Sequence, residues 1–446
     1  MTATAIAATL RETLPGARVL DGGALDGYEL AGVRPTISVR PTSAAEVADV
    51  LRLAGERGWA LAALGGGTML DLGNPPVRLD ALVDLSALNA VVDYQPDDLT
   101  LTVQAGVTLD TVATLLAERG QMLPLDVPLP RRATIGGALA CDAAGPRALR
   151  YGTGRDLVIG MQTALPRQGL ARSGGKVVKN VAGYDLAKLH IGGLGTLGII
   201  TEVTFKLWPS LAGQGSLVAT FDSLAAAHTA AQQLLASQLF PAALELLGPR
   251  AGAALATGSR AEPEHGQWLL AALFLGAFDA VQRQTRDTMT LCTQAGAPVV
   301  TALEPEQRAR LFDGIRDYGR SADQAAAVIL RASVLPAQTA HAVAVLEALT
   351  LPEADMPAIL ARPGRGTARG FWREAPAAGA HAAIAAARAE LAAIGGHLVV
   401  ERAPAALART IDAWGFAAPD LALMRRLKQA YDPDAVLSPG RFVGGL

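Results

Sequence analysis

Residues 192–207, GGLGTLGIITEVTFKL, join a glycine-rich turn to a run of alternating β-branched residues. Residues 193–198 spell the pattern GxGxxG, which in a dinucleotide-binding Rossmann domain follows a strand, opens a helix and precedes an acidic residue about 20 positions on. Here residues 199–207 follow the pattern, and their alternation predicts a strand. The glycines therefore lie on the wrong side of the element, which argues against a nicotinamide-binding Rossmann domain.

Two further glycine clusters precede this one. Residues 64–70, LGGGTML, follow the short apolar run 61–64. Consecutive glycines can adopt positive φ and bring several N–H groups close to one anion, and Thr68 adds a hydroxyl; a simple tight turn is the alternative. The second cluster is 134–138, TIGGA, followed by 142–145, DAAG. Small residues there let a flat ring or a diphosphate lie against the main chain, or let a helix pack closely on a strand.

The rest of the chain alternates Ala-rich helical patterns with short Val/Ile/Leu runs, as in α+β and α/β proteins. Ser43, with Glu46 three residues later, predicts the start of a helix over 44–57 that Gly58 ends. The glycine content falls after residue 210, so we place a domain boundary within 209–214. Further expected elements are strands at 61–64, 99–103, 215–221, 268–275 and 328–335, helices at 108–118 and 223–238, and a C-terminal helix after 421.

Composition excludes several classes of protein. The 446 residues suggest two or three domains, and 39 basic against 41 acidic residues leave a net charge of -2. That balance provides no positive electrostatic field that would attract nucleic acid or an anionic membrane surface. The only two cysteines, Cys141 and Cys292, cannot form a disulfide framework or ligate an iron–sulfur cluster. Without a secretory signal or a long apolar segment, we expect a soluble cytoplasmic protein, at most peripherally membrane-associated.

Taken in order, these segments resemble the FAD domain of the vanillyl-alcohol-oxidase, or PCMH-type, flavoproteins. The matching stretches are 40–58 (RPTSAAEVADVLRLAGERG), 64–70 (LGGGTML), 133–146 (ATIGGALACDAAGP), 150–160 (RYGTGRDLVIG), 178–207 (VKNVAGYDLAKLHIGGLGTLGIITEVTFKL) and, at the C-terminal end, 427–442 (LKQAYDPDAVLSPGRF). Within that superfamily, 174–189 and 438–446 are most similar to the FAD-binding subunits of bacterial glycolate oxidases.

The resemblance implies an α+β fold with a PCMH-type two-subdomain FAD-binding lobe and a ferredoxin-like α+β cap. We expect the FAD-binding domain at 1–211, the cap at 212–402 and a segment returning to the FAD lobe at 403–446. The implied function is that of an FAD-binding subunit of a complex that oxidises a 2-hydroxy acid, with glycolate giving glyoxylate. The implied partners are a second FAD-containing subunit and an iron–sulfur subunit.

The resemblance also assigns the cofactor contacts. The pyrophosphate loop would be 65–70, the second contact region would be Thr134–Gly137 with Ala144 and Gly145, and the third would be 195–200. Tyr184 and Asp185 would touch or shape the flavin site; the alternative for Tyr184 is a buried tyrosine with a satisfied hydroxyl. The named residues are Gly65, Gly66, Gly67, Thr68, Met69, Leu70, Thr134, Ile135, Gly136, Gly137, Ala144, Gly145, Tyr184, Asp185, Gly195, Thr196, Gly198, Ile199 and Ile200. Neither of the first two loops contains a histidine, so we expect non-covalent FAD.

The catalytic residues are less defined. Dehydrogenases of this fold use a His/Glu-rich metal and base site in the cap, but the six histidines here show no ligand spacing, and we predict no metal. Arg331, on an apolar strand, is a candidate for holding a substrate carboxylate or for pairing with an acid, and Tyr184 is a second candidate. Lys176 and Lys179 could meet an anion or lie on a solvated loop. The chain is then either a self-sufficient hydroxy-acid dehydrogenase or an FAD-binding partner that relays electrons or scaffolds the complex.

Overall fold

The computed structural model describes residues 3–25, 28–176, 184–256, 263–264, 266–376, 379–415 and 419–446. They form two compact units. The first comprises Met1–Ala144, Thr153–Ser210 and Ala417–Leu446, and the second comprises Gly145–Gly152 and Leu211–Phe416. The C-terminal part of the first unit begins at Ala417, and the expected bounds of 1–211, 212–402 and 403–446 stay a prediction.

The first sheet of the first unit has the strand order β1-β2-β4-β3. Its strands are β1 (Arg18–Asp21), β2 (Ile37–Arg40), β4 (Ala81–Asp84) and β3 (Leu61–Leu64). β4 is parallel to both β2 and β3, whereas β1 is antiparallel to β2. Helix α1 (Ala3–Thr13) packs on β1, and α2 (Ala44–Arg57) packs against the second sheet of this unit. As predicted, the Ser43 hydroxyl accepts a hydrogen bond from the Glu46 N–H at 3.2 Å, and Gly58 ends α2 at φ 68°.

The second sheet is antiparallel, with the order β5-β6-β10-β8-β9. Its strands are β5 (Val91–Gln95), β6 (Thr100–Gln104), β10 (Ile199–Lys206), β8 (Val158–Leu165) and β9 (Gly169–Gly174). The unit also contains the short helices α3 (Leu109–Ala117), α4 (Ile135–Ala140), α6 (Gly154–Leu157) and α7 (Ala187–His190) and the strand pair β7 (Gln121–Met122) and β11 (Trp208–Pro209). Its 3₁₀ turns are η1 (Gly22–Leu25), η2 (Leu85–Ala87) and η6 (Val443–Gly445). The third glycine cluster is followed directly by β10, so the GxGxxG pattern precedes a strand.

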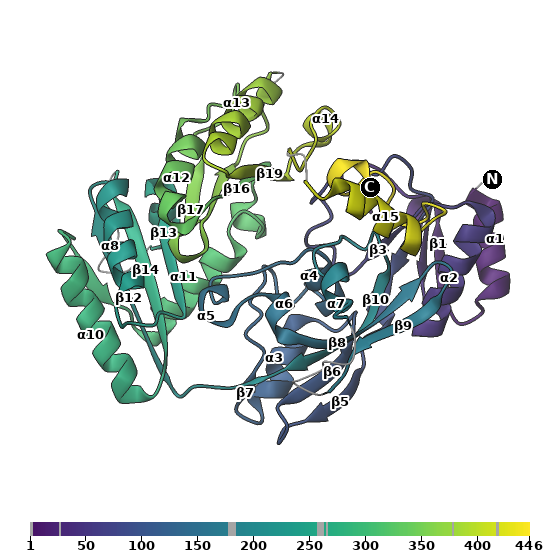
Figure 1. The fold of residues 1–446 in the computed structure, drawn as a ribbon, viewed down its shortest axis with the longest axis horizontal. Coiled ribbons are helices and arrows are strands. Elements are labelled where there is room, and N and C mark those ends of the chain that lie inside the picture. The colour runs from purple at the N-terminus through teal and green to yellow at the C-terminus, as the bar shows by residue number, and fades with distance from the viewer. Residues whose placement is uncertain are drawn as a thin grey trace. The chain divides into compact units, whose positions relative to one another are not determined.

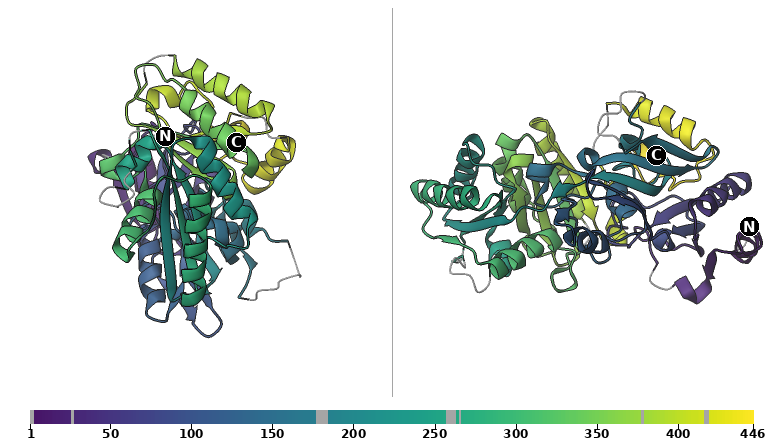
Figure 2. Two further views of the ribbon diagram at one scale, coloured as in Figure 1. Left: turned by 90° about the vertical axis from the view of Figure 1, so that its left-hand side faces the viewer. Right: turned by 90° about the horizontal axis from the view of Figure 1, so that it is seen from below.

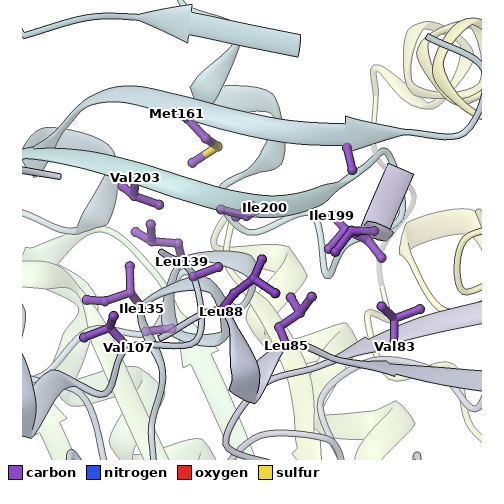
Figure 3. Packing of buried hydrophobic residues seen from close by; sticks show 14 of the residues in the cluster. Val83, Leu85, Leu88, Val107, Ile135, Leu139, Met161, Ile199, Ile200 and Val203 are labelled. Carbon is purple, nitrogen blue, oxygen red and sulfur yellow. The ribbon is translucent and has the colours of Figure 1, made fainter. Parts of the chain in front are cut away.

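A large hydrophobic core joins the two sheets of the first unit. Figure 3 shows Val83 and Leu85 from the first sheet and its following turn facing Ile199 and Ile200 at the start of β10. Ile135 of α4 is fully buried in the same cluster. Because the three glycine clusters adjoin this core, the packing of apolar side chains fixes where the three loops meet.

The C-terminal helix α15 (Leu421–Tyr431) lies beside the second sheet of this unit (Figure 2). After it, the chain pairs with the first sheet: the Leu61 N–H donates to the Val436 carbonyl and the Ser438 N–H donates to the Leu61 carbonyl, both at 2.7 Å. Since β3 leads directly into the first glycine cluster, the C-terminal segment supports the base of that loop. Within the described ranges, the structure has no helix long and apolar enough to span a bilayer.

The second unit is built on one eight-stranded antiparallel sheet of order β15-β12-β14-β13-β17-β18-β16-β19. Its strands are β12 (Gly213–Phe221), β13 (Ala243–Leu247), β14 (Trp268–Gly276), β15 (Val300–Ala302), β16 (Val328–Ser333), β17 (Ala358–Arg362), β18 (Thr367–Trp372) and β19 (His397–Arg402). Its helices are α5 (Ala148–Tyr151), α8 (Leu224–Ala236), α9 (Pro249–Leu255), α10 (Phe278–Gln294), α11 (Pro305–Asp317), α12 (Thr339–Ala348), α13 (Ala380–Ala393) and α14 (Ala405–Ala408), with 3₁₀ turns η3 (Ala322–Gln324), η4 (Pro336–Gln338) and η5 (Pro363–Arg365).

This sheet consists of two successive ferredoxin-like halves, β12-α8-β13-β14-α10-β15 and β16-α12-β17-β18-α13-β19, joined edge to edge where β13 pairs with β17. Helices α8, α10, α12 and α13 cover one face, and α11 lies on the other (Figure 1). The α+β fold with a ferredoxin-like second domain is therefore confirmed. The duplication leaves no fixed sequence period, because α9 interrupts the first half between β13 and β14 and α11 lies between the two halves.

Candidate cofactor-binding site

The three glycine clusters line one pocket of the first unit, which we call the glycine slot. The predicted residues in its wall are Gly65, Gly66, Gly67, Thr68, Met69 and Leu70 from the first cluster, Thr134, Gly136 and Gly137 from the second, and Gly195, Gly198, Ile199 and Ile200 from the third. Segments that are far apart in the sequence therefore present their main chains to the same space.

Close approach of the first two loops explains several of these glycines. A Cβ on Gly66 would lie 1.7 Å from the Arg132 carbonyl oxygen, and one on Gly65 would lie 2.2 Å from the Thr134 hydroxyl. Likewise, a Cβ on Gly136 would lie 2.7 Å from the Ala105 side chain. At these positions the missing side chain lets loops and strands touch. The packing explanation of these glycines is therefore confirmed, and the ligand explanation stays a prediction.

Gly67 and Gly195 are required for a different reason. They adopt φ values of 68° and 72°, and a Cβ on either would meet nothing closer than 3.7 Å. Positive φ is unfavourable for residues with a Cβ, so glycine serves the turn itself at these two positions. The turns direct the main chain of the first and third clusters around the slot.

The glycine slot is small and partly open to solvent. About 70 Å³ inside its walls is accessible to solvent, and about 720 Å³ is free of protein atoms when the open mouth is included. Leu85, Ile199 and Ile200 give it an apolar floor that continues into the core. A small, partly open slot lined by main chain suits an extended ligand laid along it rather than a compact one held in a closed cavity.

The C-terminal segment adds two residues to the slot that sequence reasoning did not nominate, Ser438 and Arg441. The Arg441 side chain is buried, and its Nη2 donates to the carbonyls of Leu70 at 2.9 Å and Leu72 at 2.7 Å. Burial lowers the pKa of Arg441 to about 10, and Cys141 and Asp71 oppose this shift. The group stays protonated at neutral pH and places a positive charge in the wall.

A buried lysine ties this segment to the third glycine cluster. Lys428 Nζ donates to the Thr196 carbonyl at 2.7 Å, to the Leu437 carbonyl at 2.9 Å and to the Asp432 carboxylate at 2.7 Å. Asp432, 2% exposed, also accepts hydrogen bonds from the Val436 and Leu437 N–H groups. Each polar group thus has a partner, which buried charges require.

Other residues of the glycine slot were also missed: Ala62, Ala63, Leu85, Ala140, Cys141 and Leu194. Ala140 and Cys141 end the small-residue run of the second cluster, and Leu194 lies inside the third, so extending each cluster by a few residues would have found them. Leu85 offers no such signal, because it follows β4, far from any glycine cluster in the sequence.

Several predicted cofactor contacts lie elsewhere. Ile135 is fully buried in the core, and the Thr196 hydroxyl donates to the Gly193 carbonyl at 2.7 Å. Ala144 and Gly145 are absent from the lining of the slot. Tyr184 is 92% exposed, so it is not the buried tyrosine that was the alternative, and Asp185 is exposed and pairs with Lys188 at 3.5 Å.

Arg331 is held by an acid of the second unit. Its Nε donates to Glu401 at 2.7 Å, and Nη1 donates to the Ser333 hydroxyl at 2.7 Å. Arg369, directly opposite Arg331 in the pairing of β16 with β18, also binds Glu401 at 2.9 Å. Burial alone would raise the pKa of Glu401, but Arg369 and Arg331 lower it well below its usual range. The carboxylate is therefore ionised and clamped by two guanidinium groups.

The remaining polar candidates do not converge on a site. Lys176 pairs with Asp93 at 2.7 Å, whereas Lys179 and His265 lie outside the described residues. In the part of the chain that the structure describes, no three His, Cys, Asp or Glu side chains form a group able to hold a metal ion.

Comparison with known families identifies two domains. Residues 35–173 match the FAD binding domain family. Residues 213–353 and 413–442 match the family described as FAD linked oxidases, C-terminal domain. The first match includes the first two glycine clusters, and the second includes the C-terminal segment with Ser438 and Arg441.

Curated relatives include two glycolate oxidase subunits. Subunit GlcE of Escherichia coli is 41% identical over 28% of this chain and 37% of its own length, and subunit GlcD of Bacillus subtilis is 30% identical over 62% of this chain and 59% of its own. The match thus spans less than two thirds of either subunit. An uncharacterised FAD-linked oxidoreductase of Mycobacterium tuberculosis is 29% identical over 98% of both chains.

Solved structures share the fold. p-Cresol methylhydroxylase with bound substrate superposes with a TM-score of 0.76 over 98% of this chain and 96% of that one, at 18% identity. Alkyldihydroxyacetonephosphate synthase gives 0.68 over 92% and 78%, also at 18% identity. The solved structures thus share the PCMH-type fold, and the two family matches show an FAD binding domain followed by the C-terminal domain of FAD linked oxidases, the domain order of an FAD-dependent oxidoreductase.

Proposed function

We propose that this chain binds one FAD without a covalent bond in the glycine slot and acts as the FAD-binding subunit of a complex that oxidises a 2-hydroxy acid, with glycolate giving glyoxylate. The observation that carries the proposal is the meeting of three glycine clusters in one open slot. Support for the substrate class comes from relatives named glycolate oxidase, D-lactate dehydrogenase and D-2-hydroxyglutarate dehydrogenase.

The residues present suit a dinucleotide with a diphosphate. The 65–70 loop offers main chain and the Thr68 hydroxyl, and Arg441 contributes a positive charge to the same wall. Positive charge and main-chain donors are the groups that bind phosphate oxygens in proteins. When bound, FAD would supply the acceptor for the hydride that leaves the hydroxyl-bearing carbon. The glycine slot would hold the cofactor and exclude water from its apolar floor.

The cofactor claim can be tested on the purified chain. We expect a yellow protein whose colour passes into the supernatant after acid precipitation, because no covalent attachment holds the flavin. Colour that stays with the precipitate would contradict non-covalent binding. A colourless chain that does not take up added FAD would remove the basis of the whole proposal.

The partners follow from how electrons must leave the site. With only two cysteines in its sequence, this chain cannot ligate an iron–sulfur cluster, so a cluster that takes electrons from the flavin would have to lie in another protein. We propose a second FAD-containing subunit and an iron–sulfur subunit. Co-purification of the tagged chain from its native host should recover both, and recovery of the chain alone with full glycolate-oxidising activity would contradict the complex.

One observation favours a second candidate, a chain that itself binds and oxidises the hydroxy acid. Arg331 and Arg369 bring two positive charges to Glu401. Within the described residues, Arg331 Nη2 and Arg369 Nη1 make no hydrogen bond, although both side chains are mostly buried. A substrate carboxylate would fit these donors. Arg331 is therefore the catalytic-site candidate that we retain, and the solvent-exposed Tyr184 is the weaker one.

Anaerobic reduction separates the two candidates. If the companion subunit performs the oxidation, glycolate should leave the flavin of the isolated chain oxidised. Adding the partner subunits should then bleach the absorbance of this flavin. Bleaching by glycolate without partners would favour the self-sufficient dehydrogenase. In that case Arg331→Met should raise the KM for glycolate, whereas Arg283→Met, which removes an exposed arginine paired with Asp287 on α10, should not.

A further inference from the structure

The second unit contains a hollow, separate from the glycine slot, that nothing above assigns. We call it the arginine hollow. It encloses about 540 Å³ of solvent-accessible space, far more than a two-carbon acid requires. It is bounded by α9, the residues Pro263, Glu264 and Gly266 before β14, the loop between α11 and β16, the start of β17 and the end of β18. The residues used below are Arg250, Tyr318, Ala326, Asp355, Phe371 and Arg373.

The floor of the arginine hollow is aromatic. Phe371 is 4% exposed, and its ring meets the Tyr318 ring edge to face, with centroids 5.0 Å apart and an interplanar angle of 78°. Gly319, at φ 74°, makes this approach possible, because a Cβ there would lie 2.3 Å from the Phe371 ring. The small buried residues Ala326 and Ala358 complete an apolar surface on which a flat hydrocarbon body can rest.

Polar groups with unused donors surround this floor. Arg250 has one charged partner, Asp355, at 3.9 Å, and makes no hydrogen bond within the described ranges. The Arg373 guanidinium makes one hydrogen bond, from Nη2 to the Asp323 carbonyl at 3.3 Å. Asp355 is already occupied, since its Oδ1 accepts the N–H groups of Arg373 and Glu374. Among the described residues, Arg250 therefore keeps all of its donors and Arg373 most of its donors without a protein hydrogen-bond partner, although Glu264 also lies in the wall of the hollow.

The Tyr318 hydroxyl adds a neutral donor at the same place. It makes no hydrogen bond with any residue that the structure describes, and it lies in the wall of the arginine hollow. Burial raises the pKa of Tyr318; Arg373 and Arg250 oppose this shift and Asp355 adds to it. The phenol therefore keeps its proton at neutral pH and can donate to an anion between the two arginines.

The wall that carries Tyr318 is fixed in position. Arg402 Nη1 donates to the Gly319 carbonyl at 3.1 Å and to the Ala326 carbonyl at 3.3 Å, and the Ala326 N–H donates to the Gly319 carbonyl at 3.0 Å. The Arg373 bond to Asp323 holds the same loop. Because these contacts exist without a ligand, binding would cost little ordering of the loop.

We propose that the arginine hollow is a binding site for an organic carboxylate with a flat apolar body. The body lies on Phe371 and the small residues of the floor, and the carboxylate accepts hydrogen bonds from Arg250, Arg373 and the Tyr318 hydroxyl. The size of the hollow and its aromatic floor distinguish this ligand from the small hydroxy acid of the proposed function. The inference does not depend on that function, because the two sites share no residue.

The probe for the test is 2-naphthoate, titrated by calorimetry into the FAD-saturated chain so that the glycine slot is blocked. We expect saturable binding of one equivalent, and no detectable binding of uncharged naphthalene methanol. The double variant Arg250→Met/Arg373→Met should weaken 2-naphthoate about tenfold or more, since each hydrogen bond to a charged group contributes about that factor. Tyr318→Phe should weaken it by a smaller factor.

Arg283→Met is the matched control, because it removes one exposed arginine of the same unit outside the hollow. It should leave the affinity for 2-naphthoate unchanged. Equal far-UV circular dichroism spectra and equal thermal unfolding curves in all variants will show that each is folded. The proposal is overturned if 2-naphthoate does not bind the unmodified chain, or if the double variant binds it as tightly. Neither result would affect the FAD site, so this failure is distinguishable from failure of the proposed function.

Discussion

Replacing His190 by phenylalanine should remove most of the fall in unfolding free energy that the first unit undergoes between about pH 6.5 and pH 4. His190 ends α7 and is 5% exposed, and its ring meets the Tyr431 ring edge to face at 5.9 Å. Its Nδ1 has no hydrogen-bond partner among the described residues. A Cβ on Gly198 would lie 3.1 Å from its Cε1, so the ring packs directly behind the third glycine cluster.

Burial without a charged partner lowers the pKa of His190 to about 4. In the unfolded chain the pKa returns to about 6.5, so below that pH the unfolded state binds a proton that the folded state does not. The free energy of unfolding must therefore decrease as pH falls from about 6.5 to about 4. The loss is about 2 kcal/mol at pH 5 and about 3 kcal/mol in full, at 1.36 kcal/mol per unit of difference.

Phenylalanine keeps an aromatic ring against Tyr431 and cannot be protonated. Urea unfolding of the FAD-free chain, followed by the fluorescence of Trp59 and the other tryptophans, should be compared at pH 7 and pH 5, since Trp59 is buried in the core of the same unit. The unmodified chain should lose about 2 kcal/mol more than His190→Phe over this interval. The exposed His381 provides the control, because His381→Phe should keep the loss of the unmodified chain. Equal losses in His190→Phe and the unmodified chain would refute the reasoning.

Three further changes test other parts of the structure. Lys428→Met leaves the buried Asp432 carboxylate without its cation and should lower the free energy of unfolding by about 3–5 kcal/mol in denaturant titrations, with partial recovery on adding Asp432→Asn. Gly66→Ala, whose Cβ would strike main chain, should raise the Kd for FAD about tenfold or more, whereas Gly58→Ala, whose Cβ meets open space, should not. Glu401→Gln should lower the free energy of unfolding at pH 7 and reduce the loss of stability in acid. The lowered pKa of Glu401 stabilises the fold above about pH 4, and this contribution is lost as the pH falls further. An unchanged dependence of the unfolding free energy on pH would contradict this.

Features encoded by neighbouring residues were predictable. The helix over 44–57, with its Ser43 cap and Gly58 end, and the strand at 61–64 have the predicted bounds. The strand after residue 198 excluded the Rossmann interpretation of GxGxxG, and β10 confirms it. Capping hydrogen bonds, positive φ and alternation act over a few residues, so a single sequence displays them. The family resemblance supplied the α+β fold, which these local signals alone did not distinguish from α/β.

The composition of the glycine slot depended on tertiary structure. Arg441 meets the Leu70 carbonyl only because the chain returns after α15, and no sequence pattern near Leu70 indicates it. Arg331 shows the same limit, since its partner Glu401 is set by strand pairing in the large sheet. Tyr184 stands beside glycine-rich sequence yet is exposed. The sequence determined which segments could turn, cap and extend, because those properties are local. The tertiary structure alone decided which of them face one another, because packing of the shared core brings distant segments together.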